Sequence, residues 1–245
     1  MFSYYGSKSK IVDYYPPPKH KKIIEPFAGS ARYSLKYWEN DVLLIDKYDV
    51  IIKIWQWLQM CSINDIKRLP ILKQGEKLSD YITLSNEERL FMGFCIQQGG
   101  ASPCNVATMY NTFYNPGRKE NCIERALKKT INILPKIKHW TIIQGCYTEI
   151  PNEEATWFID PPYQFGGNRY RYSNRNINFI ELSEWCKSRT GQSIVCENTK
   201  ANWMDFVQLR KNSGSKYVTT ESIWSNHITN YDNEQMSLFG SSIKF

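Results

Sequence analysis

The sequence predicts an α/β protein in which a mostly parallel sheet is flanked by helices and carries a mainly helical insertion. Two observations lead to this prediction. Short apolar runs alternate with helical patterns over residues 1–59 and 139–245, which is typical of a parallel sheet covered on both faces. Residues 60–138 show helical patterns and a polar, turn-rich stretch, so we expect an insertion beside the sheet. At 245 residues the chain is long enough for one such domain.

The first part of the expected sheet lies near the N-terminus. A strand, a turn, a helix, a second strand and a second helix are predicted in that order, at residues 23–25, 26–30, 31–39, 42–45 and 47–59. The second strand ends directly before Asp46. This order places the turn and Asp46 at the same edge of the sheet, because the carboxyl ends of parallel strands lie side by side.

The remaining elements divide between the insertion and the second part of the sheet. Helical patterns in the insertion cover residues 64–74, 85–97 and 120–134. Further strands are predicted at residues 141–143, 156–159 and 193–196, with helical patterns at 180–189 and 200–209. Residues 217–224 and 236–239 are expected to pair as two closing strands.

Composition restricts the class of protein. The formal net charge is +7, which favours a polyanionic partner. Seven cysteines without C-x-x-C spacing and only three histidines predict reduced thiols and no metal site. No apolar run has the length of a membrane span, and the N-terminus lacks the apolar core of a signal peptide. We therefore expect a cytoplasmic protein.

The string Asp160-Pro161-Pro162-Tyr163 follows an apolar strand and is suited to holding a flat ring that carries an amine. The two prolines stiffen the turn, so Asp160 and the Pro161 carbonyl oxygen become fixed acceptors for an –NH2 group. Tyr163 offers a face for stacking. The same string is also compatible with a strand end followed by a rigid turn.

The string Glu25-Pro26-Phe27-Ala28-Gly29-Ser30 predicts a nucleoside-binding turn between a strand and a helix. Gly29 allows a ligand to approach the backbone closely. Asp46 follows 17 residues after Gly29, at the end of the next strand, where an acidic residue typically holds a ribose. Considered without the turn, Asp46 is equally compatible with a solvated carboxylate at a strand end. Because no G-x-G-x-x-G string is present here, we expect S-adenosylmethionine in place of NAD.

Together with Tyr4-Tyr5-Gly6-Ser7-Lys8, which resembles an aromatic-x-Gly-x-Lys motif, these strings occur in the order of the Dam-like DNA adenine-N6 methyltransferases. The chain resembles that group from residue 2 to about 46 and from about 140 to 165. The resemblance implies the Rossmann-like fold of S-adenosylmethionine methyltransferases and a target-recognition role for residues 60–138. It implies cofactor contacts at Tyr4, Lys8, Glu25, Phe27, Ala28, Gly29, Ser30, Asp46 and Asp160, and a catalytic role for Asp160, Pro161, Pro162 and Tyr163.

In this family Lys8 is expected near the carboxylate end of the cofactor and Tyr163 against a target base rotated out of duplex DNA. One position departs from the family pattern. Many relatives have an acidic residue after the third strand, where it binds the adenine amine of the cofactor, but this chain has Cys146 there. We expect backbone groups or another side chain to replace that contact. The resemblance also implies a bacterial or phage-infected cell as the host and leaves open a cognate restriction endonuclease as a partner.

Two basic or polar segments are candidates for contact with double-stranded DNA. The segment 166–175 combines glycines with Arg169, Arg171 and Arg175, which suits phosphate contact, although a solvated loop has the same composition. The segment 105–118 is rich in side chains that read base edges in the major groove, with Asn111, Asn115 and Arg118 as its candidates.

Three alternatives stay open. Pro103-Cys104 and Glu197-Asn198 resemble motifs of the cytosine-C5 methyltransferases, in which a thiolate attacks the ring. Against this, Cys104 lies in the predicted insertion, and Thr199 stands where that group has valine. Methylation of cytosine N4 or of adenine in RNA is closer chemistry, and Asp160 favours adenine. An inactive DNA-binding relative is the third alternative, against which the intact motif residues argue.

Overall fold

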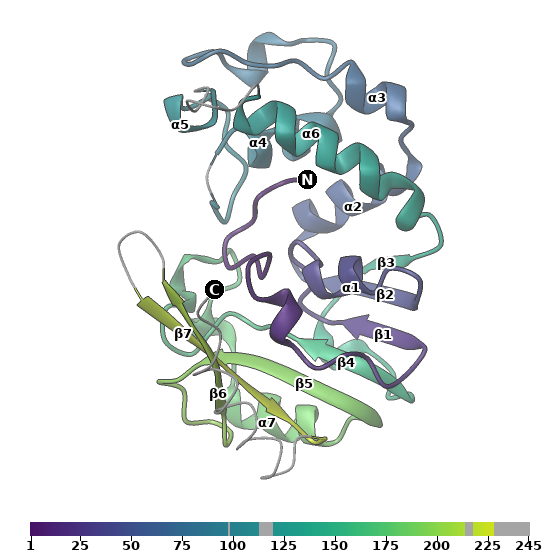
Figure 1. The fold of residues 1–245 in the computed structure, drawn as a ribbon, viewed down its shortest axis with the longest axis vertical. Helices are drawn as coiled ribbons and strands as arrows, with labels where there is room; N and C mark the ends of the chain where they lie inside the picture. The colour runs from purple at the N-terminus through teal and green to yellow at the C-terminus, as the bar shows by residue number, and fades with distance from the viewer. Residues whose placement is uncertain (98, 113–119, 214–217, 228–245) are drawn as a thin grey trace, which may run out of the picture.

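A seven-stranded sheet forms the centre of the described part of the molecule (Figure 1). The computed structural model describes residues 1–97, 99–112, 120–213 and 218–227. The strands are β1 (Lys22–Glu25), β2 (Asp41–Asp46), β3 (Thr141–Gln144), β4 (Ala155–Ile159), β5 (Gly191–Asn198), β6 (Val207–Ser213) and β7 (Val218–Ser225). Their spatial order is β3-β2-β1-β4-β5-β7-β6.

The pairing within this sheet confirms the predicted fold class. Strands β1 to β5 pair in parallel, whereas β7 is antiparallel to both β5 and β6. This order, with a reversed strand beside β5, is typical of S-adenosylmethionine methyltransferases. The connections leave β1 and β4, which are neighbours, toward opposite edges of the sheet. A crevice for a ligand is therefore expected at the carboxyl ends of β1 and β4.

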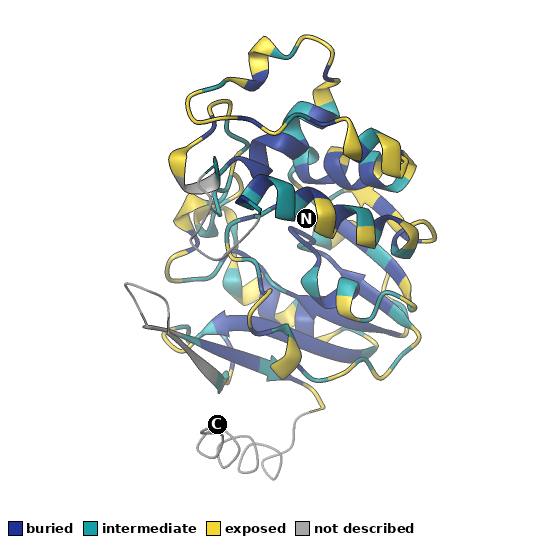
Figure 2. Cartoon of the chain, turned by 45° about the horizontal axis from the view of Figure 1, so that its top comes forward, coloured by how far each residue is buried: buried dark blue, intermediate teal, exposed yellow. Residues whose placement is uncertain are grey.

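Both faces of the sheet are covered, which explains why its central strands are apolar along their whole length. All five residues of β4 are buried, and the residues of the sheet fall into two separate apolar clusters. The central strands of the sheet are drawn as buried, and exposed residues lie on the outer helices and loops (Figure 2). One cluster is covered by α1 (Arg32–Lys36), α2 (Asp49–Met60) and the insertion, and the other by α7 (Phe179–Lys187).

The insertion contains α3 (Ile63–Lys67), α4 (Asn86–Cys95), α5 (Met109–Thr112) and α6 (Cys122–Ile133). Ser62, Ser85 and Asn121 begin α3, α4 and α6 with capping boxes, in which an acidic residue three positions later completes the cap. The insertion shares its core with the sheet, because the ring of Phe2 lies against those of Trp55, Phe91 and Phe94. The N-terminal segment therefore joins the insertion to the sheet, and the boundaries 60 and 138 stay a prediction.

Two predicted elements differ from the structure. The helix expected over 64–74 ends at Lys67, three residues before Pro70, which cannot continue it. The helix expected over 200–209 is wrong: Trp203 and Phe206 pack against each other, and the chain then enters β6. Strand β7 consequently pairs with β6, and residues 236–239, its predicted partner, lie outside the described residues.

The searched part of the chain, residues 1–97, 99–112, 120–213 and 218–227, has no helix with both the length and the apolar character that crossing a membrane requires.

Candidate active site

A cavity of about 260 Å³ opens at the carboxyl ends of β1, β2 and β4, where the strand order reverses. Its walls come from four parts of the chain: the N-terminal segment, the turn after β1, the ends of β2 and β3, and the segment from β4 to α7. All nine residues predicted to contact the cofactor line it, namely Tyr4, Lys8, Glu25, Phe27, Ala28, Gly29, Ser30, Asp46 and Asp160. Their position agrees with that role, which stays a prediction.

The turn after β1 is held by hydrogen bonds on every side. Gly29 has a φ of +44°, and its carbonyl oxygen accepts a hydrogen bond of 2.9 Å from Nε1 of the buried Trp55. Ala31, the residue before α1, has a φ of 45° and a ψ of 46°, a left-handed conformation that costs a residue other than glycine about 1–2 kcal/mol. Strain of this kind concentrates at ligand-binding turns, and here it lies in the cavity wall.

Glu25, at the end of β1, replaces the missing cap of α1. Ala31 has no side chain that could accept a hydrogen bond, and the Glu25 carboxyl oxygen instead accepts one of 2.7 Å from the Ser34 backbone N–H. Burial raises the pKa of Glu25 to about 8, although the bond from Ser34 acts in the opposite direction. The carboxyl group is therefore largely protonated at neutral pH.

Asp46 ties the end of β2 to the same turn. Its Oδ2 accepts a hydrogen bond of 3.0 Å from the Gly29 N–H, and its Oδ1 accepts one of 2.8 Å from the Tyr48 N–H. Burial raises the pKa of Asp46 to about 6, and these two bonds oppose the rise. Each carboxylate oxygen keeps a second lone pair, so the residue can accept from the hydroxyls of a ribose without releasing the turn.

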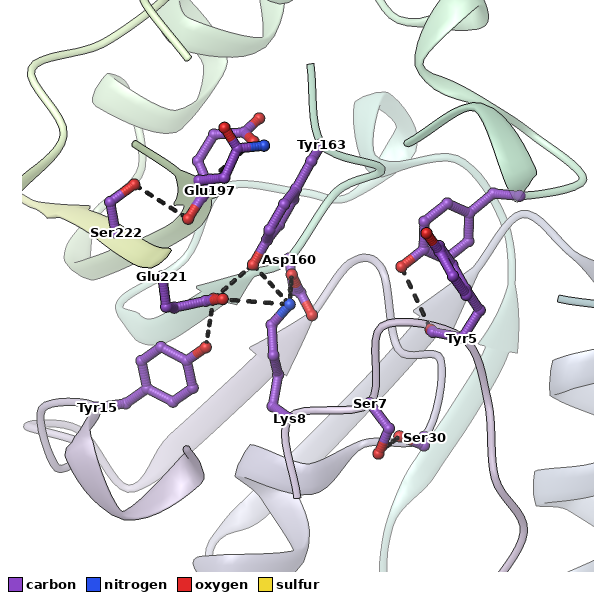
Figure 3. Close-up of polar contacts among 12 residues, drawn as sticks. Tyr5, Ser7, Lys8, Tyr15, Ser30, Asp160, Tyr163, Glu197, Glu221 and Ser222 are labelled. Carbon is purple, nitrogen blue, oxygen red and sulfur yellow. Dashed lines mark hydrogen bonds and ion pairs between the residues drawn. The ribbon is translucent and has the colours of Figure 1, made fainter. Parts of the chain in front are cut away.

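The D-P-P-Y string lies at the end of β4 with Asp160 directed at Lys8 (Figure 3). The Lys8 ammonium lies 2.8 Å from Asp160 Oδ1 and donates a 2.6 Å hydrogen bond to the Tyr163 hydroxyl. Burial would lower the pKa of Lys8, but the charges of Asp160 and Glu221 raise it. Burial raises the pKa of Asp160 to about 6, and Lys8 opposes this rise. At neutral pH the pair is therefore an ammonium beside a carboxylate.

Sequence reasoning missed Glu221, which completes this cluster from β7. Its side chain is 9% exposed, and Oε1 accepts hydrogen bonds from the hydroxyls of Tyr15, at 2.7 Å, and of Tyr163. The same oxygen lies 3.7 Å from the Lys8 ammonium (Figure 3). The sequence contains one signal: Glu221 is the single charged residue in β7, and the other side chains of this strand are apolar or hydroxylic.

Tyr163, which is predicted to offer a face for stacking, is held by its hydroxyl in the described structure. Its hydroxyl is held between Lys8 and Glu221, and its ring centre lies 4.4 Å from the ammonium. In the described structure the cavity wall at this point consists of Asp160 and Pro162, with Tyr163 outside it. Contact with a target base stays a prediction.

A tyrosine bridge, formed by Tyr5 and Tyr170, connects the N-terminal segment to the segment after β4. The two rings are 5.1 Å apart, and the Tyr170 hydroxyl donates a hydrogen bond of 3.3 Å to the Tyr5 carbonyl oxygen. Gly6 has a φ of +74°, and a Cβ added there would lie 2.1 Å from the Tyr170 hydroxyl oxygen. Only glycine therefore fits at this position of the cavity wall.

Arg32 is a second cavity residue that the sequence did not indicate. Its Nε donates a hydrogen bond of 3.1 Å to Ser7 Oγ, and Ser30 Oγ lies 3.0 Å from the same Ser7 oxygen. Burial lowers the pKa of Arg32 to about 10, so the guanidinium stays charged at neutral pH. Arg32 with Ser7 and Ser30 can hold a carboxylate, a role that the sequence had given to Lys8.

Another part of the cavity wall consists of aromatic rings and of residues at the start of α7. The rings of Phe27 and Tyr147 are 5.4 Å apart, and Cys146 lies beside them. The Cys146 backbone N–H donates a hydrogen bond of 2.8 Å to Glu149 Oε2. Glu181, in the first turn of α7, lines the cavity on this side and is an acidic group that could replace the missing contact at position 146.

The predicted DNA contacts are only partly within the described structure. Arg169, Arg171 and Arg175 are exposed in the segment after the D-P-P-Y string. Arg169 also lies 5.8 Å from the ring centre of Tyr5, beside the tyrosine bridge. The side chain of Asn111 and the residues Asn115 and Arg118 lie outside the described residues. The exposure of the three arginines is compatible with contact to phosphates, which stays a prediction.

The arrangement expected for a cytosine-C5 methyltransferase does not form from its two candidate groups. The Cys104 thiol donates to the Val106 carbonyl oxygen within the insertion. The Glu197 carboxylate accepts hydrogen bonds from the Gln164 backbone, at 2.7 Å, and from Trp203 Nε1, at 3.2 Å. Glu197 therefore fixes the turn after the D-P-P-Y string, and neither residue lines the cavity among the described residues.

Comparisons with known proteins add little to this geometry. No protein-family model and no curated protein sequence matches the chain. A solved structure, the Escherichia coli protein named "Putative methyltransferase yhhF", matches with a TM-score of 0.32 and 9% sequence identity, over 82% of this chain and 74% of that one. Similarity at this level carries no argument about function. The strand order is a typical topology of S-adenosylmethionine methyltransferases, which describes the fold alone, and the activity must be inferred from the cavity.

Proposed function

We propose that the chain is an S-adenosylmethionine-dependent methyltransferase that methylates adenine N6 in duplex DNA. The observation that carries the proposal is the position of Asp160. It stands at the carboxyl end of β4, in the wall of the cavity that the glycine turn and Asp46 also line. A fixed amine-binding acceptor thus lies next to a site suited to a nucleoside.

The cavity has the donors and acceptors that S-adenosylmethionine requires. Asp46 is positioned for ribose hydroxyls, Phe27 and Tyr147 for the faces of an adenine, and Arg32 for a carboxylate. The turn after β1 has a single glycine, so it lacks a phosphate-binding G-x-G-x-x-G string. When bound, S-adenosylmethionine would supply a methyl group attached to a positively charged sulfur.

The amine N6 of adenine is a poor nucleophile because its lone pair is delocalised into the ring. Asp160 and the Pro161 carbonyl oxygen would accept hydrogen bonds from its two N–H groups and favour a tetrahedral nitrogen. Both acceptors also stabilise positive charge as it develops on N6. The stiffness of the two prolines fixes the direction of these bonds, so the remaining task of the cavity is alignment.

An adenine stacked in duplex DNA cannot reach this cavity, so the base must rotate out at a cost of a few kcal/mol. Stacking on an aromatic ring returns about 1–3 kcal/mol per base. Tyr163 can supply that face once its ring is uncovered, and its hydroxyl bonds to Lys8 and Glu221 hold the ring in one orientation. The exposed Arg169, Arg171 and Arg175 would hold phosphates near the rotated base, and the insertion would read the sequence.

Transfer of tritiated methyl groups from S-adenosylmethionine to mixed duplex DNA tests the proposal, with the product nucleosides resolved by mass spectrometry. The wild-type chain should form N6-methyladenine. Asp160→Ala should lose activity by roughly 100-fold to 1,000-fold, the effect of removing one acceptor that stabilises a transition state. Asp41→Ala, which removes an exposed carboxylate at the start of β2, at the opposite edge of the sheet, should retain activity.

Other products would redirect the assignment. N4-methylcytosine would keep the chemistry of Asp160 but change the base. C5-methylcytosine would return attention to Cys104, and Cys104→Ala would then abolish transfer. If the cofactor binds and DNA receives no methyl group, RNA is the next substrate to try. An absence of product on both nucleic acids would refute the proposal and favour a relative without catalysis.

A further inference from the structure

Glu221 and Asp160 place two carboxylates around one buried ammonium. The Lys8 ammonium lies 2.8 Å from Asp160 Oδ1 and 3.7 Å from Glu221 Oε1. The side chains of Lys8 and Glu221 are 8% and 9% exposed, and that of Asp160, which faces the cavity, is 20% exposed. Water therefore screens the charges of this group, the Lys8 cluster, only weakly.

The hydrogen bonds show that Glu221 acts as an acceptor. The hydroxyls of Tyr15 and Tyr163 both donate to Glu221 Oε1 (Figure 3). Burial raises the pKa of both phenols, so each keeps its proton and can only be the donor to a carboxylate. Tyr15 is itself fixed, with its ring 5.0 Å from that of Phe158 in β4.

The charges of the Lys8 cluster do not balance. Lys8 contributes one positive charge, whereas Asp160 and Glu221 contribute two negative charges. The neighbouring titratable groups do not correct this: burial raises the pKa of Tyr170 and of the Cys196 thiol, so both are neutral. Burial likewise keeps Glu25 largely protonated and raises the pKa of Glu197 to about 7. The Lys8 cluster by itself thus carries a net negative charge. Arg32, a cation that also lines the cavity, is bonded to Ser7 and makes no ion pair with Asp160 or Glu221 in the described structure.

We propose that Glu221 is a positioning residue that acts through Lys8 and Tyr163 and gives the site the net negative charge that favours a cationic sulfur and a cationic amine. Without Glu221, Lys8 and Asp160 would form a neutral pair. The inference rests on the proposed methyl transfer, in which a positive charge moves from the sulfur of the bound molecule to N6. Glu221 contacts neither group, so its effect reaches them as charge and as the orientation of Lys8 and Tyr163.

The test compares S-adenosylmethionine, whose sulfur is cationic, with S-adenosylhomocysteine, whose sulfur is neutral. Both dissociation constants are measured by titration calorimetry for wild type and Glu221→Gln, which keeps an acceptor oxygen and removes the charge. A unit charge acting over several ångströms in a partly screened site predicts that Glu221→Gln lowers the preference for the cationic molecule by roughly tenfold. A merely structural defect would weaken the binding of both molecules equally and leave the ratio of the two dissociation constants unchanged. That result would overturn the inference.

Two further variants separate charge from packing. Glu88→Gln is the matched control, since Glu88 is a buried carboxylate paired with Arg68 in the insertion and should leave the ratio unchanged. Glu221→Asp keeps the charge and shortens the reach to Tyr15 and Tyr163, so it should preserve the wild-type ratio even if stability falls. Loss of the ratio in Glu221→Asp would contradict the inference, and this variant serves if Glu221→Gln does not fold.

The binding readout is independent of catalysis. If the wild type binds both molecules and methylates no nucleic acid, the proposed function fails while the ratio still decides the role of Glu221. If the wild type methylates adenine, Glu221→Gln should also lower the rate of transfer at saturating concentrations of both substrates. A wild-type rate and a wild-type ratio in Glu221→Gln would leave the proposed function standing and refute the role of Glu221.

Discussion

Replacement of Lys8 by methionine should remove the one positive charge that holds Asp160 and Glu221 together. At 2.8 Å and 3.7 Å, with an effective dielectric constant of about 20, the two attractions amount to about 6 and about 4.5 kcal/mol. The cost of burying the ammonium offsets much of this. Breaking a buried pair by removing one partner typically costs about 3–5 kcal/mol, because an uncompensated charge stays behind. We expect Lys8→Met to lower the free energy of unfolding by that amount.

The same substitution should raise the pKa of Asp160 further, because Lys8 lowers that pKa more than Tyr163 does. Urea unfolding at pH 8 measures the stability, and the pH dependence of methyl transfer measures the second effect: its acid limb should move to higher pH. Lys8→Met combined with Glu221→Gln removes one of the two orphaned carboxylates, so the double variant should be less destabilised than the sum of the single variants. A loss below about 1 kcal/mol, or strict additivity, would refute this account of the Lys8 cluster.

Two other predictions follow from single positions. Glu25→Gln should stabilise the fold at neutral pH. The pKa of Glu25 in the folded protein, about 8, lies above its ordinary value, so its contribution to the free energy of unfolding is fully present only at low pH. That contribution is lost as pH rises from about 4.5 to 8, by about 1.4 kcal/mol per pH unit. In thermal unfolding, the difference in melting temperature between variant and wild type should widen over that pH range. A constant difference would contradict the raised pKa of Glu25. Gly6→Ala should weaken binding of S-adenosylmethionine because its Cβ displaces Tyr170, whereas Gly75→Ala, at a φ of +85° with no atom within 4 Å, should cost stability only. Equal binding by the two alanine variants in calorimetry would rule out the tyrosine bridge as part of the cavity wall.

The parts of the site that sequence predicted are those whose residues lie close together in the chain. The turn 25–30 and the string 160–163 each follow an apolar strand, and the alternation of strands and helices places both at one sheet edge. Asp46 could be predicted for the same reason. The helix expected at 200–209 failed because the apolar spacing of Trp203 and Phe206 fits a helix, while their actual contacts are with each other and with the cluster beneath α7.

The roles of Arg32 and Glu221 could not be predicted from the sequence, because it does not show which distant groups their side chains contact. The lack of other charged residues in β7 singles out Glu221 but does not show its partners. In the sequence, Arg32 is one of many basic residues. Only the structure shows that its guanidinium contacts Ser7 and the Phe2 carbonyl oxygen. Glu221 depends on the direction of β7. Its neighbours along the chain are hydroxylic and apolar, and only its pairing with Asn198 of β5 shows which sheet edge it reaches.

The reversed direction of β7 explains how Glu221 comes to lie beside Lys8. A parallel strand would present its last residues at the carboxyl edge of the sheet, whereas an antiparallel strand presents its first ones. Glu221 is the fourth residue of β7 and pairs with Asn198, the last residue of β5. The Lys8 cluster therefore joins the N-terminal segment, the end of β4 and the last strand of the described structure. Because each segment brings one charge of the cluster, the buried ammonium has both of its carboxylate partners only when all three segments are folded, and the charge of the site depends on the completed sheet.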